Sequence, residues 1–299
     1  MAATAGKTRG STGRAALWMI GSVTSFSAMA VAGREVAVTL DTFELMLYRS
    51  LIGVACVVGF GAATGRLGQV SRAHFRLHLA RNLAHFTGQN LWFYALTVIP
   101  LAQVFALEFT SPLWVALLAP FALGERLTRM RVLAVVLGFI GILVVTRPDT
   151  ATLNSGTLAA ASAAIAFALT AVATRRLTRT DTTLGILFWL TIMQAVFGLV
   201  TAGADGHITL PNAGTLPFLL VIGFGGLLAH LCLTQALALA PATVVIPIDF
   251  ARLPLIALVG ALVYGERLTL SLFAGAGLII VANTMNLRAA ARSARVPGD

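Results

Sequence analysis

Long apolar segments, separated by short stretches rich in charge, glycine and proline, run through almost the whole chain and limit what it can fold into. A helix needs about 20 apolar residues to cross the hydrocarbon core of a bilayer. Because the chain is 58% hydrophobic and only 11% charged, it lacks the charged side chains that a water-facing surface of this size needs. The sequence therefore predicts an all-α integral membrane protein with ten transmembrane helices, at about residues 16–34, 43–63, 79–98, 101–123, 131–147, 157–175, 184–203, 214–236, 243–263 and 270–288.

The pentapeptide GERLT occurs twice, at residues 124–128 and 265–269, a separation of 141 residues. The same shift aligns residues 17–36 with residues 158–177, so the repetition extends well beyond the pentapeptide. Each unit holds five expected spans, and since five is odd, the second unit must enter the membrane in the opposite orientation. We therefore expect two inverted five-helix repeats with a basic tail at each end of the chain: repeats 16–147 and 157–288, tails 1–15 and 289–299.

The basic residues indicate the orientation. With a cytoplasmic N-terminus, sixteen of the 21 Lys and Arg residues fall in cytoplasmic segments, three in outer loops and two within spans. Cytoplasmic loops carry the excess of Lys and Arg, so both termini are expected on the cytoplasmic side of the inner membrane. Residues 28–30 (AMA) resemble a signal-peptidase site. We expect no cleavage there, because the apolar run is long enough to span and has a counterpart in the second repeat.

Two segments resemble a known family. Residues 107–145, LEFTSPLWVALLAPFALGERLTRMRVLAVVLGFIGILVV, look like the EamA-type module of the drug/metabolite transporter superfamily, and residues 249–286 look like a second module. The resemblance covers about residues 16–288 and implies ten helices in an inverted repeat with the substrate held between the halves. Members carry amino acids, nucleotide-like compounds, vitamins and drugs. Residues 246–266 are similar to a ninth helix in members proposed to move riboflavin or S-adenosylmethionine.

Two acidic residues fall within expected spans at positions that the repeat relates. Glu108 lies in the fourth span and Asp249 in the ninth, again 141 residues apart. An ionisable side chain near mid-membrane costs about 2.5–3.5 kcal/mol on insertion scales, so it normally faces protein or water. Arg252, three residues after Asp249, lies on the same helix face and is placed to neutralise it. These residues are expected to converge near the symmetry axis, either to handle substrate or protons or as a buried ion pair that fixes helix packing.

Prolines flank both acidic residues. Pro112 follows Glu108 by four residues and removes the hydrogen bond that the carbonyl of Glu108 would accept, while Pro247 and Pro254 bracket Asp249. Helices interrupted at mid-membrane offer free backbone groups to a ligand. The prolines therefore support a binding site, although a kink for packing alone explains them as well.

Other polar residues within the spans are further candidates for substrate or proton binding. Arg49 is suited to an anionic substrate, or else pairs with Glu44 or extends toward the interface. The remaining candidates line a pathway or form interhelical hydrogen bonds: Asn90, Tyr94, His230 and Gln235.

Several residues receive a structural interpretation. Gly124 and Gly265 are expected to end helices in a left-handed turn, with Glu125 and Glu266 bonding loop amides or the neighbouring arginine. Glycines in GFIG (138–141) and GAG (275–277) are expected to allow close helix contact. Trp18, Trp92 and Trp189 lie toward span ends, where interfacial anchors occur. Cys56 and Cys232 are expected to be packing residues without a metal role.

The predicted function is alternating-access secondary transport of a small organic metabolite or drug, by proton coupling or exchange. The rival classes are an intramembrane enzyme or a channel that uses Glu108 and Asp249. The chain has no Gly-x-Ser-x-Gly, Gly-x-Gly-Asp or His-Glu-x-x-His motif and no P-loop, so no enzyme, cofactor or metal is expected. The basic residues form short clusters rather than a face with stacking aromatics, which argues against nucleic acid. The expected partners are substrate, membrane lipid and protons or a counter-substrate, and a homodimer is compatible with the sequence.

Overall fold

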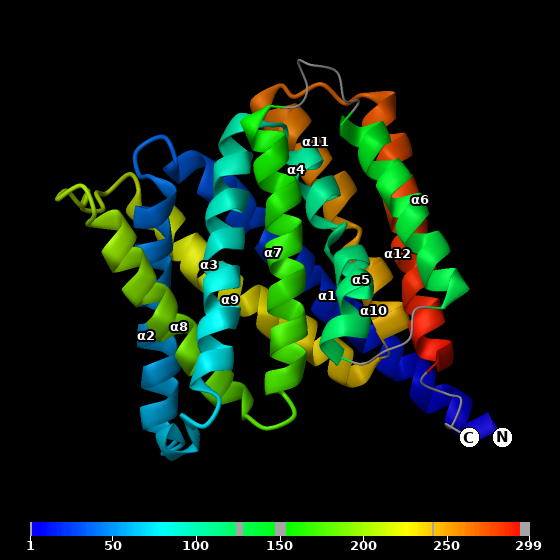
Figure 1. The fold of residues 1–299 in the computed structure, drawn as a ribbon, viewed down its shortest axis with the longest axis horizontal. Helices are drawn as coiled ribbons and strands as arrows, with labels where there is room; N and C mark the ends of the chain where they lie inside the picture. The colour runs from blue at the N-terminus through cyan, green and yellow to red at the C-terminus, as the bar shows by residue number, and fades with distance from the viewer. Residues whose placement is uncertain (1, 124–127, 147–153, 241, 294–299) are drawn as a thin grey trace.

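The computed structural model describes residues 2–123, 128–146, 154–240 and 242–293, and within these ranges every regular element is helical (Figure 1). The first helix begins at residue 2 and therefore includes basic residues that precede the first expected span. The α-helices are α1 (Ala2–Val36), α2 (Thr42–Ala63), α3 (Phe75–Val98), α4 (Leu101–Glu108), α5 (Ser111–Leu123), α6 (Arg129–Thr146), α7 (Ser155–Leu177), α8 (Thr183–Ala202), α9 (Leu216–Leu239), α10 (Ala242–Asp249), α11 (Arg252–Tyr264) and α12 (Leu270–Ser293), with a short 3₁₀ helix, η1, at Leu67–Gln69.

Eight helical segments in the described part of the chain are long and apolar enough to cross a membrane. One of them, Leu101–Ala122, runs through both α4 and α5. Neither α3 nor the α10–α11 pair is among the eight, so the count of ten stays a prediction. The polar residues of α3, including buried His78, Asn82 and Gln89, lower its hydropathy although they face the interior of the bundle.

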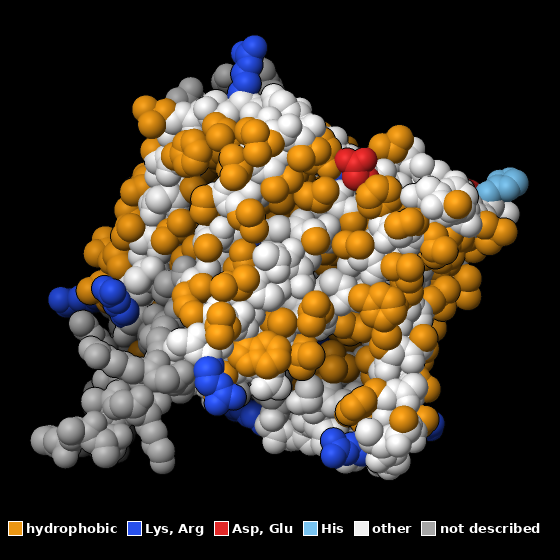
Figure 2. Space-filling model, turned by 180° about the vertical axis from the view of Figure 1, so that it is seen from behind, with side chains coloured by type: hydrophobic (Ala, Val, Ile, Leu, Met, Phe, Trp, Pro, Cys, Tyr) orange, Lys and Arg blue, Asp and Glu red, His pale blue; other side chains and the backbone are white. Residues whose placement is uncertain are grey.

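Apolar side chains cover the outside of the helix bundle. Figure 2 shows hydrophobic side chains spread over the middle of one face, with Lys and Arg mainly toward its lower edge. On α6 the exposed side chains Leu133, Val136, Ile140 and Leu143 recur at the spacing of one helix face. A soluble protein seldom exposes so large an apolar surface, and a lipid-facing surface explains it.

The strongest helix contacts join one repeat to the other. Helix α1 packs against α9, α3 against α7, α2 against α8, and α6 against α12. The 141-residue shift turns α1 into α7 and α3 into α9, so the first two contacts are exchanged by the repeat and the last two map onto themselves. The start of α1 and the end of α12 lie at the same end of the bundle (Figure 1). The two halves are therefore interlocked about a twofold relation.

Each repeat contains one interrupted helix, at the same place. Helix α4 ends at Glu108 and α5 begins at Ser111; helix α10 ends at Asp249 and α11 begins at Arg252. Both pairs of positions differ by 141 residues. Pro112 and Pro254 lie in the first turn of the second half-helix, where a missing backbone N–H costs little, whereas Pro247 lies within α10. The interruptions therefore place a carboxylate at the end of a half-helix in each repeat.

The end of α11 follows the sequence prediction for the second GERLT copy. Gly265 has a φ of 63°, the left-handed conformation that favours glycine, and the amide of Glu266 donates to the carbonyl of Gly260 at 3.0 Å. The carboxylate of Glu266, however, pairs with Arg34 and accepts the amide of Leu101 at 3.0 and 3.2 Å, rather than bonding the neighbouring Arg267. Gly124 and Glu125 of the first copy lie outside the described residues.

Candidate functional site

The two half-helix carboxylates converge on one guanidinium group. Nη2 of Arg252 donates to Oδ2 of Asp249 at 2.7 Å, and Nη1 of Arg252 donates to Oε1 of Glu108 at 3.4 Å. Arg252 and Asp249 are buried, and Glu108 is largely so. The sequence prediction that these residues meet is therefore confirmed by the geometry. We call Glu108, Asp249 and Arg252 the central cluster.

Aromatic rings surround the central cluster. The Arg252 guanidinium carbon lies 4.7 Å from the ring centre of Phe26, 5.0 Å from that of Phe109 and 5.6 Å from that of Phe105. The rings of Phe109 and Phe250, which the repeat relates, meet edge to face at 5.2 Å. Contact with ring faces stabilises a guanidinium away from water. The cluster is thus a charged group in an apolar shell contributed by both repeats.

Trp92 is the second donor to Glu108. Its indole Nε1 donates to Oε2 of Glu108 at 2.8 Å, and its side chain is buried against Phe93 and Phe105. The expectation that Trp92 is an interfacial anchor is therefore wrong. Buried tryptophan needs a partner for its N–H, and Glu108 supplies one.

Some hydrogen-bonding capacity of the central cluster is left unused. Oδ1 of Asp249 and Nε of Arg252 are buried without a hydrogen-bond partner in the described structure. At the first helix interruption, by contrast, two backbone carbonyls have side-chain donors. Asn283 of α12 donates to the carbonyl of Phe109 at 2.5 Å, and Asn286 donates to that of Pro112 at 3.1 Å. The backbone at this interruption is thus partly satisfied by α12, while carboxylate and guanidinium atoms remain available.

Arg49 does not pair with Glu44, which was one of the alternatives that the sequence left open. Nη1 of Arg49 donates to Oε1 of Gln89 at 2.5 Å. Glu44 instead accepts the amides of Asp41 at 3.1 Å and Thr209 at 2.5 Å, as part of the N-terminal cap of α2. The proposed pairing of Arg49 with Glu44 is therefore wrong.

The other candidates are dispersed. Asn90 is buried and donates to the carbonyl of Phe86 in its own helix at 2.8 Å, with its Oδ1 unpartnered. Tyr94 is exposed, and its hydroxyl meets that of Ser155 on α7 at 2.8 Å. Gln235 is exposed on α9. His230 is exposed as well, but its ring meets Phe26 edge to face at 5.2 Å and so lies beside the central cluster.

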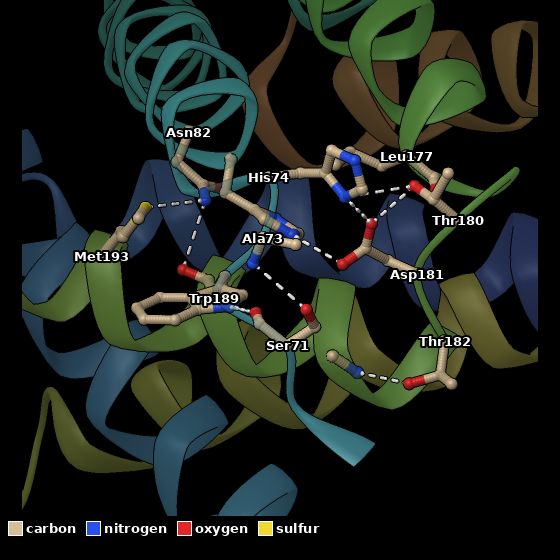
Figure 3. Close-up of polar contacts among 12 residues, drawn as sticks. Ser71, Ala73, His74, Asn82, Leu177, Thr180, Asp181, Thr182, Trp189 and Met193 are labelled. Carbon is tan, nitrogen blue, oxygen red and sulfur yellow. Dashed lines mark hydrogen bonds and ion pairs between the residues drawn. The ribbon is translucent and has the colours of Figure 1, made fainter.

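A second polar cluster lies at the start of α3 and had no counterpart in the sequence analysis. Nδ1 of His74 lies 3.0 Å from Oδ2 of Asp181, Nε2 of His78 lies 3.4 Å from Oδ1, and Thr180 donates to Oδ2 at 2.8 Å. Figure 3 shows the His74 ring and Thr180 directed at the Asp181 carboxylate. Burial opposes ionisation of Asp181, but hydrogen bonds from Thr180, His78 and His74 outweigh it and lower the pKa of this carboxyl. The cluster ties α3 to the α7–α8 connection.

The sequence signal for this second cluster was the i, i+4 spacing of His74 and His78. Spacing alone does not reveal their acidic partner, because Asp181 lies more than 100 residues away. Beside them, Asn82 donates to the carbonyl of Trp189 and to the sulfur of Met193, both at 3.2 Å (Figure 3). These contacts bind α3 to α8.

A third polar cluster lies where α1 and α11 end and α4 begins. Arg34 pairs with Glu266 and stacks on the ring of Tyr264 at 4.4 Å, while the Tyr264 hydroxyl donates to Glu35 at 2.6 Å. Glu266 also accepts the first amide of α4, from Leu101. A carboxylate at a helix N-terminus is favoured by the helix dipole. This cluster therefore links α1, α4 and α11 at the end of the bundle opposite to the Asp181 cluster (Figure 1).

An apolar groove of about 360 Å³ lies between α1, α9 and α11. Its lining includes Ala28, Val31, Val221 and Leu255. None of the charged candidates lines it, so it is separate from the central cluster.

Two related helical halves, with apolar outer surfaces and a charged cluster between them, define a multi-pass membrane transport protein. The chain belongs to the EamA-like transporter family, which it matches twice, over residues 13–147 and 154–288. The family resemblance found in the sequence is thereby confirmed.

Named relatives are transporters of small metabolites. The chain is 28% identical to an S-adenosylmethionine uptake transporter of Rickettsia felis over 89% of each chain. It is 34% identical to a riboflavin transporter of Brucella anthropi over 72% of this chain and 78% of that protein. It is 29% identical to a pseudopaline exporter of Pseudomonas aeruginosa over 86% and 90%.

A crystal structure of 21% sequence identity matches with a TM-score of 0.64, covering 94% of this chain and 99% of the other, and supports the fold alone. The family and the named relatives together make the chain a small-metabolite transporter rather than an enzyme. They lend no support to an intramembrane enzyme or a channel.

Proposed function

We propose that the chain is a secondary transporter that works by alternating access and uses the central cluster as its substrate or proton site. The observation that carries the proposal is the meeting of Glu108 and Asp249, each at a helix interruption of one repeat, on the single guanidinium of Arg252. Interrupted helices at the interface between inverted repeats are where transporters of this kind bind their substrates.

Charge supports this role. Two carboxylates and one guanidinium leave one negative charge when both acids are ionised, and a proton or a cationic group of a substrate would neutralise it. A purely structural ion pair would be expected to satisfy its own hydrogen bonds. Oδ1 of Asp249 and Nε of Arg252 have no protein partner in the described structure, which favours a ligand.

Two repeats, residues 16–147 and 157–288, are proposed to act as inverted units with their basic tails, 1–15 and 289–299, in the cytoplasm. The proposed location is the cytoplasmic membrane, and the excess of basic residues in the expected cytoplasmic loops supports the proposed orientation. Rocking of one repeat against the other would expose the central cluster to each side in turn. Proton coupling and exchange of a counter-substrate are both compatible with the cluster, and a homodimer remains compatible with the fold.

The proposed substrate is a small organic metabolite of the kinds that the relatives' names give, with S-adenosylmethionine and riboflavin as first probes. His230 and Arg49 are proposed to extend the site from the central cluster. Asn90 is proposed as a weaker contributor, because its amide is bound within its own helix. Tyr94 and Gln235, both exposed, are proposed to contribute at the edge of the pathway.

The test is flux of labelled S-adenosylmethionine and riboflavin into proteoliposomes that contain the purified protein. Glu108→Gln and Asp249→Asn should each lower the flux at least about tenfold, because each removes a charge on which the central cluster depends. Asp205→Asn changes an exposed loop carboxylate and should leave the flux unchanged. Wild-type flux in both central variants, with all proteins equally folded, would discard the proposed site.

A further inference from the structure

The two interrupted helices are packed against each other on one side of the central cluster only. Helix α4 lies against α11, whereas the halves that the repeat relates to them, α10 and α5, make no contact of comparable extent among the described residues. The α4–α11 side is the end of the bundle that the proposed orientation places outside the cell (Figure 1). The interrupted helices are therefore joined on the outer side of the cluster and further apart on the inner side.

A single carboxylate fastens this closed side. Glu266 lies just beyond the end of α11, and its side chain is only 8% exposed. It pairs with Arg34 at the end of α1 and accepts the amide of Leu101, the first residue of α4, at 3.0 and 3.2 Å. Arg34 in turn stacks on Tyr264, whose hydroxyl donates to Glu35 at 2.6 Å. Glu266 belongs to the second repeat and its partners belong to the first, so its carboxylate joins the two halves at the outer end.

The position of this carboxylate depends on Gly260. The amide of Glu266 donates to the carbonyl of Gly260 at 3.0 Å, which folds the chain back over the last turn of α11. A Cβ atom added to Gly260 would collide with Oε2 of Glu266 and lie 3.1 Å from its Cδ. Alanine at residue 260 would therefore displace the carboxylate from Leu101 and Arg34 without changing any charge.

Helices α4 and α11 connect this contact to the central cluster. Helix α4 has Leu101 at one end and Glu108 at the other, and its eight residues span about 12 Å. Helix α11 begins at Arg252 and is followed, two residues after its end, by Glu266. Both half-helices thus run from the central cluster to the Glu266 carboxylate. A displacement of Glu108 relative to Arg252 would be carried along them to the contact between Leu101 and Glu266.

From this arrangement we propose that Glu266 is the outer gate of the transport pathway. Its carboxylate caps α4 and holds α4 against α11 while the outer side is closed, and release of the Leu101 amide lets the two half-helices separate and opens the central cluster to the outside. The inference rests on the proposed function, because it takes the orientation and the central cluster from it. A carboxylate suits this role, since it is favoured at a helix N-terminus and beside an arginine, and water can hydrate all three groups once the site opens.

The test measures access to the space between the gate and the central cluster. Arg252, Ile256 and Gly260 are four residues apart and share one face of α11, and Ile256 is fully buried between the other two. Ile256→Cys therefore places a thiol behind the gate. In a chain whose Cys56 and Cys232 are replaced by alanine, a membrane-impermeant methanethiosulfonate added to intact cells reaches this thiol only through the outer end.

With the gate intact, labelling of Ile256→Cys should be slow. Glu266→Ala, which removes the cap on α4, and Gly260→Ala, which displaces it, should each raise the labelling rate at least about tenfold, since loss of a charge-assisted hydrogen bond shifts a two-state equilibrium by that order. Arg267→Ala is the matched control, because this exposed neighbour of Glu266 carries a charge but takes no part in the pairing with Arg34. It should be labelled at the rate of the parent chain.

A parallel series keeps native Cys232, which is buried in α9, as the only cysteine and should show no acceleration. Fast labelling of the parent chain, or the parent rate in either Glu266→Ala or Gly260→Ala, would overturn the inference. Acceleration of the same size in Arg267→Ala or at Cys232 would overturn it too, because it would reflect a general loosening of the fold. Flux in the variants of the two central carboxylates tests the proposed function separately, and its loss would support that function whatever the labelling shows.

Discussion

At the scale of single residues, partner choice is what the sequence predicts least well. Glu108, Asp249 and Arg252 could be brought together in advance, because the repeat relates the two acids and Arg252 lies one helical turn after Asp249. Trp92 gave no such signal, although it donates to Glu108. Indole groups near span ends are usually interfacial, and only the packing of α3 against the interrupted helix gives this one an acidic partner.

Asp181 allows a pH-dependent prediction at this scale. Its lowered pKa means that the folded protein favours the carboxylate more than the unfolded chain does. The resulting stability is fully present above the ordinary pKa of the carboxyl and is lost as the pH falls through the folded-state value. Asp181→Asn should therefore lower the free energy of unfolding by about 1–3 kcal/mol at pH 7.

The difference between Asp181→Asn and wild type should shrink as the pH falls below about 4, because the carboxyl of the unfolded chain takes up a proton there, while that of the folded protein does so only at lower pH. Thermal unfolding in detergent across this pH range measures it. Because Asp181 also bonds His74 and His78, the titration of these histidines does not cancel, and the informative part of the comparison is the change between about pH 4 and pH 3. A difference that does not change between about pH 4 and pH 3 would show that the carboxylate charge is not what holds this cluster together.

At the scale of helices, sequence patterns predicted most helix positions, although α1 begins well before the expected residue 16, and they did not predict the hydrogen bonds between helices. The expected spans, the helix interruptions beside Pro112 and Pro254, and the left-handed turn at Gly265 all follow from local chemistry. The asparagines Asn283 and Asn286, which donate to carbonyls at the first interruption, could not be found this way. Their counterparts one repeat earlier are Ile142 and Val145, so the repeat gives no hint of their role.

The crossing of α6 and α12 depends on glycine, as the GFIG and GAG motifs predicted. A Cβ on Gly141 would lie 2.9 Å from the carbonyl oxygen of Gly275 and 2.8 Å from Cγ1 of Ile279. Gly141→Val should therefore push the helices apart and cost about 1–3 kcal/mol of stability. Gly277→Ala in the same GAG motif meets nothing within 4 Å and is the control. Thermal unfolding of the two variants in detergent decides the matter; equal stability would mean that the close approach is unimportant.

At the scale of the whole molecule, the 141-residue repeat predicted more of the helix arrangement than hydropathy did. It relates the α1–α9 contact to the α3–α7 contact and places both interruptions at equivalent positions. Hydropathy finds eight spans in the described residues; α3, whose polar side chains turn inward, is not among them, and neither is the α10–α11 pair. Burial against protein, which no single-sequence hydropathy window records, makes such a helix compatible with a membrane.

The proposed opposite orientation of the halves explains why the two GERLT copies have different flanks. The first is followed by RMR at residues 129–131 and the second by LSL at residues 270–272. Basic residues favour retention in the cytoplasm, so the first copy is expected inside and the second outside. A reporter fused after Arg131 should read as cytoplasmic, and one fused after Thr269 should read as external.

The effect of the basic flanks on membrane orientation can be tested with reporter fusions of the same kind. Changing residues 270–272 from LSL to RMR, in a fusion made after residue 272, should lower the external signal of the reporter, because it places two arginines on the side where they oppose translocation. Changing residues 129–131 from RMR to LSL should weaken cytoplasmic retention at the first copy. Enzymatic reporters that are active on only one side of the membrane give the readout. Identical readings after Arg131 and Thr269 in the unaltered chain would refute inverted halves, and with them any mechanism in which Glu108 and Asp249 meet through opposed but equivalent helices.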